Sequence, residues 1–373
     1  MAQTCPVSIG QSLDDVDSPA LIVELDAYER NMDRMVRLLE TTSQRLRPHA
    51  KTHKSPLIAL EQTARGAVGI CCQKLAEAKV MIDGGIDNVF ISNEVVGARK
   101  AEHLATLAKK AQISVCVDDR RNVEQLDSAA QAIGATVTAL VEIHVGGKRC
   151  GVPPGDAACE LAEQVAKSPS LTFGGLQAYH GPAQHIRDFH QRRDAVMMAA
   201  DHTRKTIEQL SRAGLPCRTI TGGGTGTLMH DIEAGVLNEL QAGSYVFMDA
   251  DYALNLDEHG ETDRRFEQSL FVTATVMSKL RKGLAVIDAG LKALAFDCGP
   301  PLIYGRDHVC YDSASDEHGK LALSDEHAVA YGEKLLLIPG HCDPTVNLYD
   351  WYVGVRDGRV ERVWEVTARG ALG

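Results

Sequence analysis

Residues 44–64 read QRLRPHAKTHKSPLIALEQTA, and they contain the repeating unit of the chain. Residues 44–49 are a short strand candidate and residues 55–64 a helix candidate, with a cluster of basic side chains between them. Similar units, each an apolar run followed by an amphipathic stretch, continue to about residue 250. The sequence therefore predicts alternating strands and helices over most of its length.

Eight strand–helix units fit into this region. The predicted strands are residues 20–25, 44–49, 68–72, 88–92, 113–117, 136–143, 172–179 and 217–221. Eight parallel strands with right-handed crossovers close naturally into a (β/α)8 barrel. A doubly wound open sheet is the alternative, but Leu25-Asp26-Ala27 stands where its Gly-x-Gly-x-x-Gly turn belongs. We therefore predict an α/β protein built on a TIM barrel.

The pattern changes after about Met248. Short apolar runs separated by Gly, Pro, Asp and Asn replace the helical periodicity, and Arg356-Asp357-Gly358-Arg359 is a good hairpin turn. This pattern of short apolar runs and turn residues predicts a C-terminal mainly-β domain. We expect the barrel to span residues 1–255 and the β-domain residues 256–373, with a charged linker at residues 255–265.

Composition argues against nucleic-acid-binding, membrane-spanning and secreted, disulfide-rich classes of protein. The 373 residues are 44% hydrophobic and 24% charged, as in ordinary globular proteins. A net charge of −11 argues against nucleic acid or an anionic membrane as partner. No apolar run is long enough to span a bilayer, and the N-terminus does not resemble a signal peptide. The ten cysteines show no disulfide or metal-binding spacing, so we expect the reducing cytoplasm.

Lys51 is the first candidate catalytic residue. It follows a predicted strand among His49, His53 and Lys54, where neighbouring bases can lower its pKa and make it a nucleophile for imine formation. The alternative is that Lys51 and Lys54 are solvated loop lysines.

The catalytic groups of barrels lie at the carboxyl ends of the strands. Those ends carry further polar side chains, including Gln73, Asn93, Glu94, Asp118, Asp119, Glu142, His144, Arg149, Gln177, Tyr179, His180 and His185.

A glycine turn follows the predicted eighth strand, at Thr221-Gly222-Gly223-Gly224-Thr225-Gly226. Consecutive glycines let backbone amides converge on an anion, and barrels often bind phosphate after strands seven and eight. A flexible turn is the alternative reading. An imine-forming lysine beside a phosphate site suggests pyridoxal phosphate. Arg149, Tyr179 and His180 are residue types that could contact its ring, although Tyr179 could equally be core and Arg149 a surface ion pair.

The β-domain offers a candidate metal site. His341 and Asp343 are two residues apart, so in an extended segment their side chains point the same way. An imidazole and a carboxylate suit Mn²⁺, Mg²⁺ or Zn²⁺, and two protein ligands would leave positions open for substrate.

The chain resembles the D-threonine aldolase family of fold-type III, alanine-racemase-like pyridoxal phosphate enzymes. The resembling motifs are Arg47-Pro48-His49-Ala50-Lys51, Gly69-Ile70-Cys71-Cys72-Gln73-Lys74, Arg149-Cys150-Gly151-Val152, Leu176-Gln177-Ala178-Tyr179-His180-Gly181, Thr221 to Gly226, Met248-Asp249-Ala250-Asp251-Tyr252 and His341-Cys342-Asp343-Pro344-Thr345. The resemblance implies Lys51 as the Schiff-base lysine and His185 as a base near the substrate hydroxyl. It also implies cofactor contacts from Gln73, Arg149, Tyr179, His180, Gly223, Gly224, Thr225 and Tyr245, and a divalent cation on His341 and Asp343.

The resemblance also implies the reaction and the partners. A β-hydroxy-D-amino acid would be cleaved between Cα and Cβ to glycine and an aldehyde, in a head-to-tail homodimer. Asp343 favours Mn²⁺ or Mg²⁺ over Zn²⁺, since hard carboxylate oxygens suit hard cations. The alternatives are a 3-hydroxy-D-aspartate aldolase, a dehydratase of D-serine or D-threo-3-hydroxyaspartate, and a non-enzymatic pyridoxal phosphate carrier.

Overall fold

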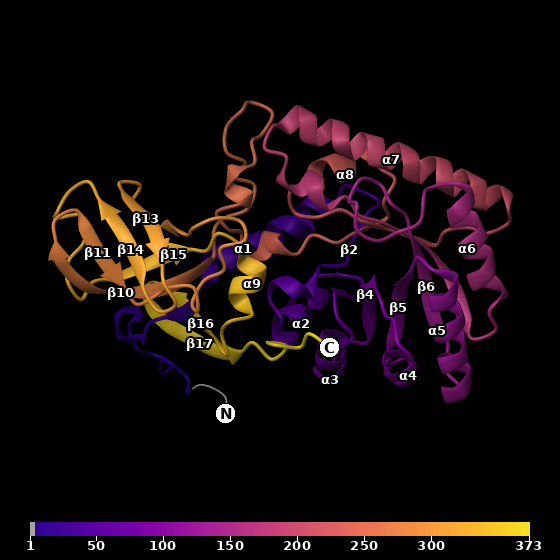
Figure 1. The fold of residues 1–373 in the computed structure, drawn as a ribbon, viewed down its shortest axis with the longest axis horizontal. Helices are drawn as coiled ribbons and strands as arrows, with labels where there is room; N and C mark the ends of the chain where they lie inside the picture. Colours follow the sequence, from indigo (N-terminus) through magenta and orange to yellow (C-terminus); the bar gives the residue numbers. More distant parts are fainter. Residues whose placement is uncertain (1–3) are drawn as a thin grey trace.

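The structure, a computed structural model, describes residues 4–373. A larger part, in which helices surround a core of strands, lies beside a smaller β-rich part (Figure 1). The described residues include no helix long and apolar enough to cross a bilayer.

The larger part is built on eight parallel strands in the order β2-β9-β8-β7-β6-β5-β4-β3. A parallel bridge between His49 and Cys71 joins the two end strands, so the sheet curls into a barrel. This confirms the predicted fold class. The strands are β2 (Arg45–Leu46), β3 (Ile70–Cys72), β4 (Asn88–Glu94), β5 (Gln112–Val117), β6 (Val137–Glu142), β7 (Leu171–Ala178), β8 (Thr219–Gly222) and β9 (Glu239–Leu240).

Helices cover the outside of these strands, and their apolar faces supply much of the core. Helix α7, the longest of those described, runs across the barrel beside the short helix α8 (Figure 1). The helices are α1 (Leu25–Leu39), α2 (Pro56–Ala64), α3 (Leu75–Asp83), α4 (Ala98–Leu107), α5 (Arg120–Ile133), α6 (Asp156–Lys167), α7 (Phe189–Arg212) and α8 (Leu228–Ala234). Short 3-10 turns are η1 (Leu13–Asp15), η2 (Ala50–Thr52), η3 (Gly181–His185), η4 (Ser244–Val246) and η5 (Tyr252–Leu254).

The β-rich part contains a second sheet and one short helix, α9 (Cys342–Val346). The predicted hairpin at residues 356–359 is confirmed, because β16 and β17 pair antiparallel across Asp357 and Gly358. The strands are β1 (Ala20–Glu24), β10 (Leu270–Arg281), β11 (Leu284–Ile287), β12 (Leu302–Ile303), β13 (Val309–Ala314), β14 (Gly319–Leu323), β15 (Lys334–Ile338), β16 (Trp351–Arg356) and β17 (Arg359–Glu365).

The first predicted barrel strand is wrong. Strand β1 lies in the second sheet, between antiparallel β10 and parallel β16, and the N-terminal segment accordingly runs through the β-rich part in Figure 1. An apolar run buried on both faces reads the same in either sheet, so periodicity alone does not assign it. We propose that residues 4–24 belong to the β-rich domain.

The eighth barrel strand is β9, which the sequence did not predict. It has only two residues and begins with Glu239, a poor strand former on its own. Its carboxylate accepts from the buried Arg47 guanidinium, with Nε–Oε2 at 2.7 Å, so the charge is paired inside the barrel. The predicted number of strands is right although one member is wrong and one was missed.

Aromatic side chains hold the two parts together. Phe247 lies 6.3 Å from Tyr28 of α1 and 5.7 Å from Tyr352 of β16, measured between ring centroids. The Tyr352 hydroxyl donates to the His53 carbonyl over 2.7 Å, two residues beyond Lys51. Packing of this kind excludes water and resists sliding, so the β-rich part is fixed next to the Lys51 segment.

Candidate active site

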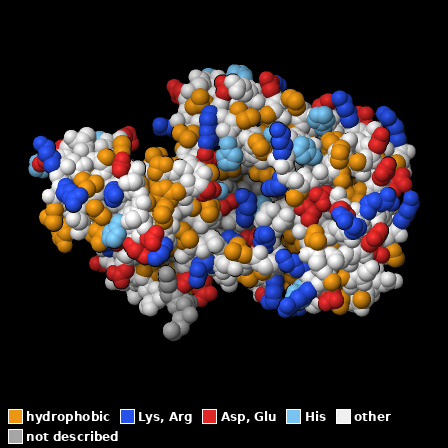
Figure 2. Space-filling view, viewed as in Figure 1, with side chains coloured by type: hydrophobic (Ala, Val, Ile, Leu, Met, Phe, Trp, Pro, Cys, Tyr) orange, Lys and Arg blue, Asp and Glu red, His pale blue; other side chains and the backbone are white. Residues whose placement is uncertain are grey.

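A cavity of about 310 Å³ opens at the carboxyl ends of the barrel strands. The face shown in Figure 2 is hollowed near the middle of the molecule, and Lys, Arg and His side chains stand around the hollow. A volume of this size suits a small cofactor or ligand. The cavity is lined by His49, Lys51, Thr52, Gln73, Ser92, Arg149, Gln177, Tyr179, Gly223, Gly224, Thr225, Gln241, Gly243, Ser244 and Tyr252.

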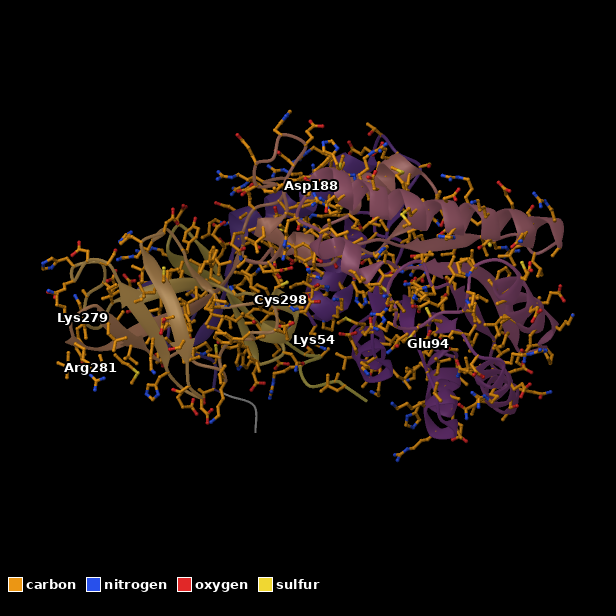
Figure 3. All side chains as sticks on the ribbon, turned by 45° about the horizontal axis from the view of Figure 1, so that its top comes forward. Lys54, Glu94, Asp188, Lys279, Arg281 and Cys298 are labelled. Carbon is orange, nitrogen blue, oxygen red and sulfur yellow. The ribbon has the colours of Figure 1, made fainter. Side chains whose placement is uncertain are left out.

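Lys51 faces this cavity from the turn η2, and its Nζ lies 2.5 Å from Oδ2 of Asp343. The expected lowering of its pKa is wrong for this arrangement. Burial lowers the pKa of the Lys51 ammonium, but the facing Asp343 carboxylate outweighs burial and raises the pKa above its ordinary value. Lys54, labelled in Figure 3, is buried and donates to Glu77 over 3.2 Å, so it is neither solvated nor part of the cavity.

The His49 side chain holds the backbone of Lys51 in place. Its Nδ1 accepts from the Lys51 amide over 3.3 Å, and its Nε2 lies 3.1 Å from both Gln73 Oε1 and Ser92 Oγ. Burial, together with the Lys51 charge, lowers the pKa of His49 to about 3. A neutral imidazole therefore fixes the backbone of the lysine turn and joins it to Gln73, the predicted cofactor contact after β3.

Arg149 and Tyr179 meet on one wall of the cavity, with the Arg149 guanidinium carbon 5.6 Å from the centre of the Tyr179 ring. The same guanidinium lies 3.8 Å from Glu142. Burial, with the Glu94 charge nearby, raises the pKa of Glu142 to about 8. His180, predicted beside them, lies outside this cavity. It lines a smaller neighbouring one, and its Nδ1 accepts from the Ala183 amide over 3.3 Å.

The glycine turn also lines the cavity and follows β8, the neighbour of the strand that precedes Tyr179. Gly223 and Gly224 have no room for a side chain: a Cβ would lie 2.5 Å from Asp231 Oδ2 and 2.5 Å from Gln184 Oε1, respectively. The Thr225 hydroxyl accepts from the Tyr245 amide over 3.0 Å. The Tyr245 side chain does not line this cavity. It is buried elsewhere and its hydroxyl accepts from Gln62 over 3.1 Å, so only its backbone supports the turn.

His341 and Asp343 converge beside Lys51, with 3.8 Å between His341 Nε2 and Asp343 Oδ2. The segment is not extended as expected, because α9 begins at Cys342 and His341 precedes it. Two ligands of one cation at bonds of about 2.1 Å lie roughly 3–4 Å apart, so the pair fits a divalent ion. Burial raises the pKa of Asp343, but Lys51 and His341 outweigh burial and hold it below its ordinary value.

Two aspartates to which the sequence analysis gave no role, Asp297 and Asp249 of the Met248–Tyr252 motif, hold the candidate metal ligands in place. Asp297 Oδ2 lies 2.7 Å from His341 Nδ1, which leaves Nε2 facing Asp343. Asp249 Oδ2 accepts from the Cys342 amide over 2.9 Å and so anchors the start of α9. Cys298, labelled in Figure 3, has its sulfur within 4.8 Å of ligand atoms of Asp297 and His341.

His185 is outside the cavity lining but close to it. Its ring stacks on Tyr252, which lines the cavity, with centroids 6.0 Å apart. Its Nδ1 lies 2.6 Å from Oδ2 of Asp251, a carboxylate that also pairs with Arg187. The sequence offered one signal for Asp251, its place in the Met248–Tyr252 motif. An aspartate on one ring nitrogen fixes the tautomer and leaves the other nitrogen for chemistry.

Comparison with known proteins agrees with this geometry. Residues 23–251 match the family described as "Alanine racemase, N-terminal domain", and residues 269–355 match "Putative serine dehydratase domain". The chain is 45% identical to a D-threonine aldolase of an Arthrobacter species, over 98% of this chain and 96% of that protein. It is 43% identical to a 3-hydroxy-D-aspartate aldolase of Paracoccus denitrificans, over 98% and 95%.

Among solved structures, the crystal structure of D-threonine aldolase from Filomicrobium marinum superposes with a TM-score of 0.97 at 50% identity, covering all of both chains. The match covers the full length of this chain, so it includes the β-rich part as well as the barrel. This chain therefore belongs to the D-threonine aldolase family of alanine-racemase-like, fold-type III enzymes.

Proposed function

We propose that this protein is a lyase that cleaves β-hydroxy-D-amino acids of the D-threonine type into glycine and an aldehyde, using pyridoxal phosphate and a divalent cation. The observation that carries the proposal is the 2.5 Å contact between Lys51 Nζ and Asp343 Oδ2. It brings the amine proposed to form the imine and the carboxylate proposed to hold the cation to one point of the cavity. A lyase of this class needs both groups at the same substrate.

Residues of the cavity suit the cofactor. Lys51 would bind its aldehyde carbon, and the turn at Gly223, Gly224 and Thr225, which lines the same cavity, would hold its phosphate. Arg149 and Tyr179, which contact each other and line the same cavity, would bound its ring. When bound, pyridoxal phosphate supplies a place for the electron pair that remains when Cα–Cβ breaks.

The substrate's β-hydroxyl would lie between the candidate metal ligands and His185. His341 and Asp343 would hold a cation that supplies positive charge for that oxygen. We propose that His185, fixed by Asp251 at 2.6 Å, accepts the hydroxyl proton through its other ring nitrogen. Loss of this proton lets the Cα–Cβ bond break as the aldehyde carbonyl forms, and protonation of Cα then yields glycine.

The metal is proposed to be Mn²⁺ or Mg²⁺ because Asp343 offers a hard oxygen ligand. Cys298 stands near His341, and a thiolate there would instead favour Zn²⁺. Dialysis against a chelator, followed by addition of each metal, separates these ions: Mn²⁺ should restore cleavage better than Zn²⁺. A protein that cleaves at full rate after chelation would contradict the metal role.

Product analysis tests the reaction itself. The purified protein with pyridoxal phosphate should release glycine with acetaldehyde from D-threonine, and glycine with glyoxylate from 3-hydroxy-D-aspartate. The ratio of the two rates identifies the preferred side chain, which identities of 45% and 43% to the two kinds of aldolase leave open. Release of ammonia and a keto acid in place of glycine would overturn the proposal in favour of a dehydratase.

Borohydride reduction and peptide mapping test the site. The cofactor should be found on Lys51, and labelling at another lysine would refute the assignment.

We also propose a head-to-tail homodimer in the cytoplasm. All ten cysteines fall within the described residues and are free, as a reducing compartment predicts. Light scattering of the purified protein would show the proposed dimer as twice the 40.3 kDa chain.

A further inference from the structure

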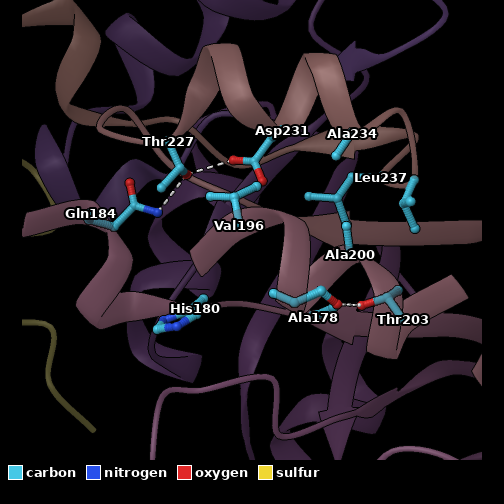
Figure 4. A pocket seen from close by; sticks show the side chains of 13 residues that line it. Ala178, His180, Gln184, Val196, Ala200, Thr203, Thr227, Asp231, Ala234 and Leu237 are labelled. Carbon is cyan, nitrogen blue, oxygen red and sulfur yellow. Dashed lines mark hydrogen bonds between the residues drawn. The ribbon is translucent and has the colours of Figure 1, made fainter. Parts of the chain in front are cut away.

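A small second cavity lies directly behind the glycine turn, and Asp231 of α8 is its acidic group (Figure 4). Asp231 is 8% exposed, and its Oδ2 would touch a Cβ placed on Gly223 at 2.5 Å. The carboxylate thus lies against the rear of the backbone that, by the proposed function, holds the cofactor phosphate on its front.

A chain of hydrogen bonds connects Asp231 to the turn. The Thr227 hydroxyl donates to Asp231 Oδ2 over 2.6 Å, and Gln184 Nε2 donates to the same hydroxyl oxygen over 2.8 Å (Figure 4). Gln184 in turn accepts from the Gly226 amide over 3.0 Å. These contacts make Asp231 a support of the turn's shape, at a position that does not line the main cavity.

No cation accompanies this carboxylate among the described residues that line the cavity. Helix α7 contributes Val196, Ala199, Ala200 and Thr203; β7 and the residues after it contribute Ala178, His180 and Gln184; the segment after α8 contributes Val236 and Leu237. The other titratable group is His180, and burial lowers its pKa, so it is neutral at neutral pH. Asp231 therefore has hydroxyl and amide partners but no compensating charge.

Bound phosphate would place a second anion on the other side of the same turn. A phosphate monoester carries a charge of about −1.5 to −2 near pH 7. Two anions separated by a backbone segment, with low-dielectric packing around one of them, repel each other strongly unless one is neutralised. Burial already raises the pKa of Asp231 to about 7, although hydrogen bonds from Thr227 and the Gly224 amide favour its charged form.

We propose that Asp231 is a positioning residue that takes up a proton when the cofactor phosphate binds the glycine turn, so that cofactor affinity falls as the pH rises. The proposal rests on the proposed function, because it places pyridoxal phosphate at this turn. The neutral carboxyl keeps its contact with Thr227 and removes the repulsion. Above neutral pH, binding must include the free energy of protonating Asp231.

The test compares the wild-type protein with Asp231→Asn, which keeps the size and an accepting oxygen but carries no charge. The dissociation constant for pyridoxal phosphate is measured by absorbance titration from pH 6.5 to 8.5. Protonation of the phosphate, of Lys51 and of the cofactor ring is common to both proteins. The ratio of the wild-type constant to the Asp231→Asn constant should rise about tenfold or more over this range, since a full proton linkage contributes about tenfold per pH unit.

Calorimetry in two buffers with different ionisation enthalpies gives the proton count directly. At pH 7.5 the wild type should take up roughly half to one proton more than Asp231→Asn on binding the cofactor. Equal proton counts and parallel pH profiles in the two proteins would overturn the inference. If Asp231→Asn does not fold, infrared difference spectra of the wild type at pH 8 replace it: cofactor binding should increase the band of a protonated carboxyl, and an unchanged band would refute the proposal.

Failure of the proposed function gives a different result. In that case pyridoxal phosphate would not bind, or would not be reduced onto Lys51, in either protein at any pH. Binding to Lys51 without a proton linkage would contradict only the role of Asp231.

Discussion

Gly223→Ala should show how closely the glycine turn is packed. Gly223 has a φ of +69°, a left-handed backbone that costs an L-residue about 1–2 kcal/mol. Its new Cβ would also lie 2.5 Å from Asp231 Oδ2, so the carboxylate or the turn must move. Overpacking of a buried site typically costs a further 1–3 kcal/mol. We expect a total loss of about 2–5 kcal/mol in the free energy of unfolding.

Gly235→Ala is the matched control. Gly235 ends α8 with a nearly equal φ of +62°, but a Cβ there would meet nothing within 4 Å. It should therefore lose only the backbone term of about 1–2 kcal/mol and bind pyridoxal phosphate normally. The difference between the two variants isolates the contact with Asp231.

The assay is urea unfolding of the cofactor-free proteins, together with absorbance titration of the cofactor. Gly223→Ala should be less stable than Gly235→Ala and should bind pyridoxal phosphate at least about tenfold more weakly, which corresponds to 1.4 kcal/mol. Equal stability and equal cofactor affinity in the two variants would show that the turn accepts a methyl group without a cost from Asp231, and the reasoning from its geometry would be refuted.

Four further outcomes are expected. Lys51→Ala should lose the visible absorbance of the bound cofactor and all cleavage; turnover at the wild-type rate would remove Lys51 from the mechanism. His341→Ala should weaken Mn²⁺ binding at least about tenfold in equilibrium dialysis, because one of two protein ligands is lost; unchanged binding would move the site elsewhere. Glu239→Gln should lower the free energy of unfolding by about 2–4 kcal/mol, since Arg47 would stay buried with less compensating charge; urea unfolding checks this, and a loss below 1 kcal/mol would contradict it. Asp231 has a folded pKa of about 7 against an ordinary 3.8, so its proton stabilises the fold fully below pH 3.8 and that stability is lost as the pH rises through 7; Asp231→Asn should accordingly gain up to about 4 kcal/mol over the wild type at pH 8 and little at pH 4.

The barrel could be predicted because its signal is local. Strands and helices alternate with distinct periods, and six of the eight predicted strands overlap barrel strands of three residues or more. The two-residue strand β9 has no period to detect, and its partner Arg47 is distant in sequence. Strand β1 was assigned to the wrong sheet because hydrogen-bond partners, not composition, decide to which sheet a buried strand belongs.

The candidate site residues also divide into those that local sequence patterns predict and those that depend on contacts with distant segments. Lys51, Gln73, Arg149, Tyr179 and the glycine turn follow predicted strands, and parallel strands bring their carboxyl ends together at one mouth. His180 and Tyr245 also lie near that mouth, but neighbouring contacts turn their side chains away from the main cavity. The supporting residues Asp249, Asp251 and Asp297 act through contacts with distant segments, so their partners could not be predicted from the sequence, although Asp249 and Asp251 stand in a resembling motif.

The sequence by itself determined the strand–helix alternation, a lysine after a predicted strand and a glycine turn. It also determined that two residues of metal-binding type, His341 and Asp343, stand two positions apart. These features depend on backbone propensity and on side-chain chemistry within a few residues. Only the tertiary structure decided that Asp343, 292 positions from Lys51, meets its ammonium and raises its pKa. That encounter depends on how the β-rich part packs against the barrel through Phe247 and Tyr352, and such packing is a property of the whole chain.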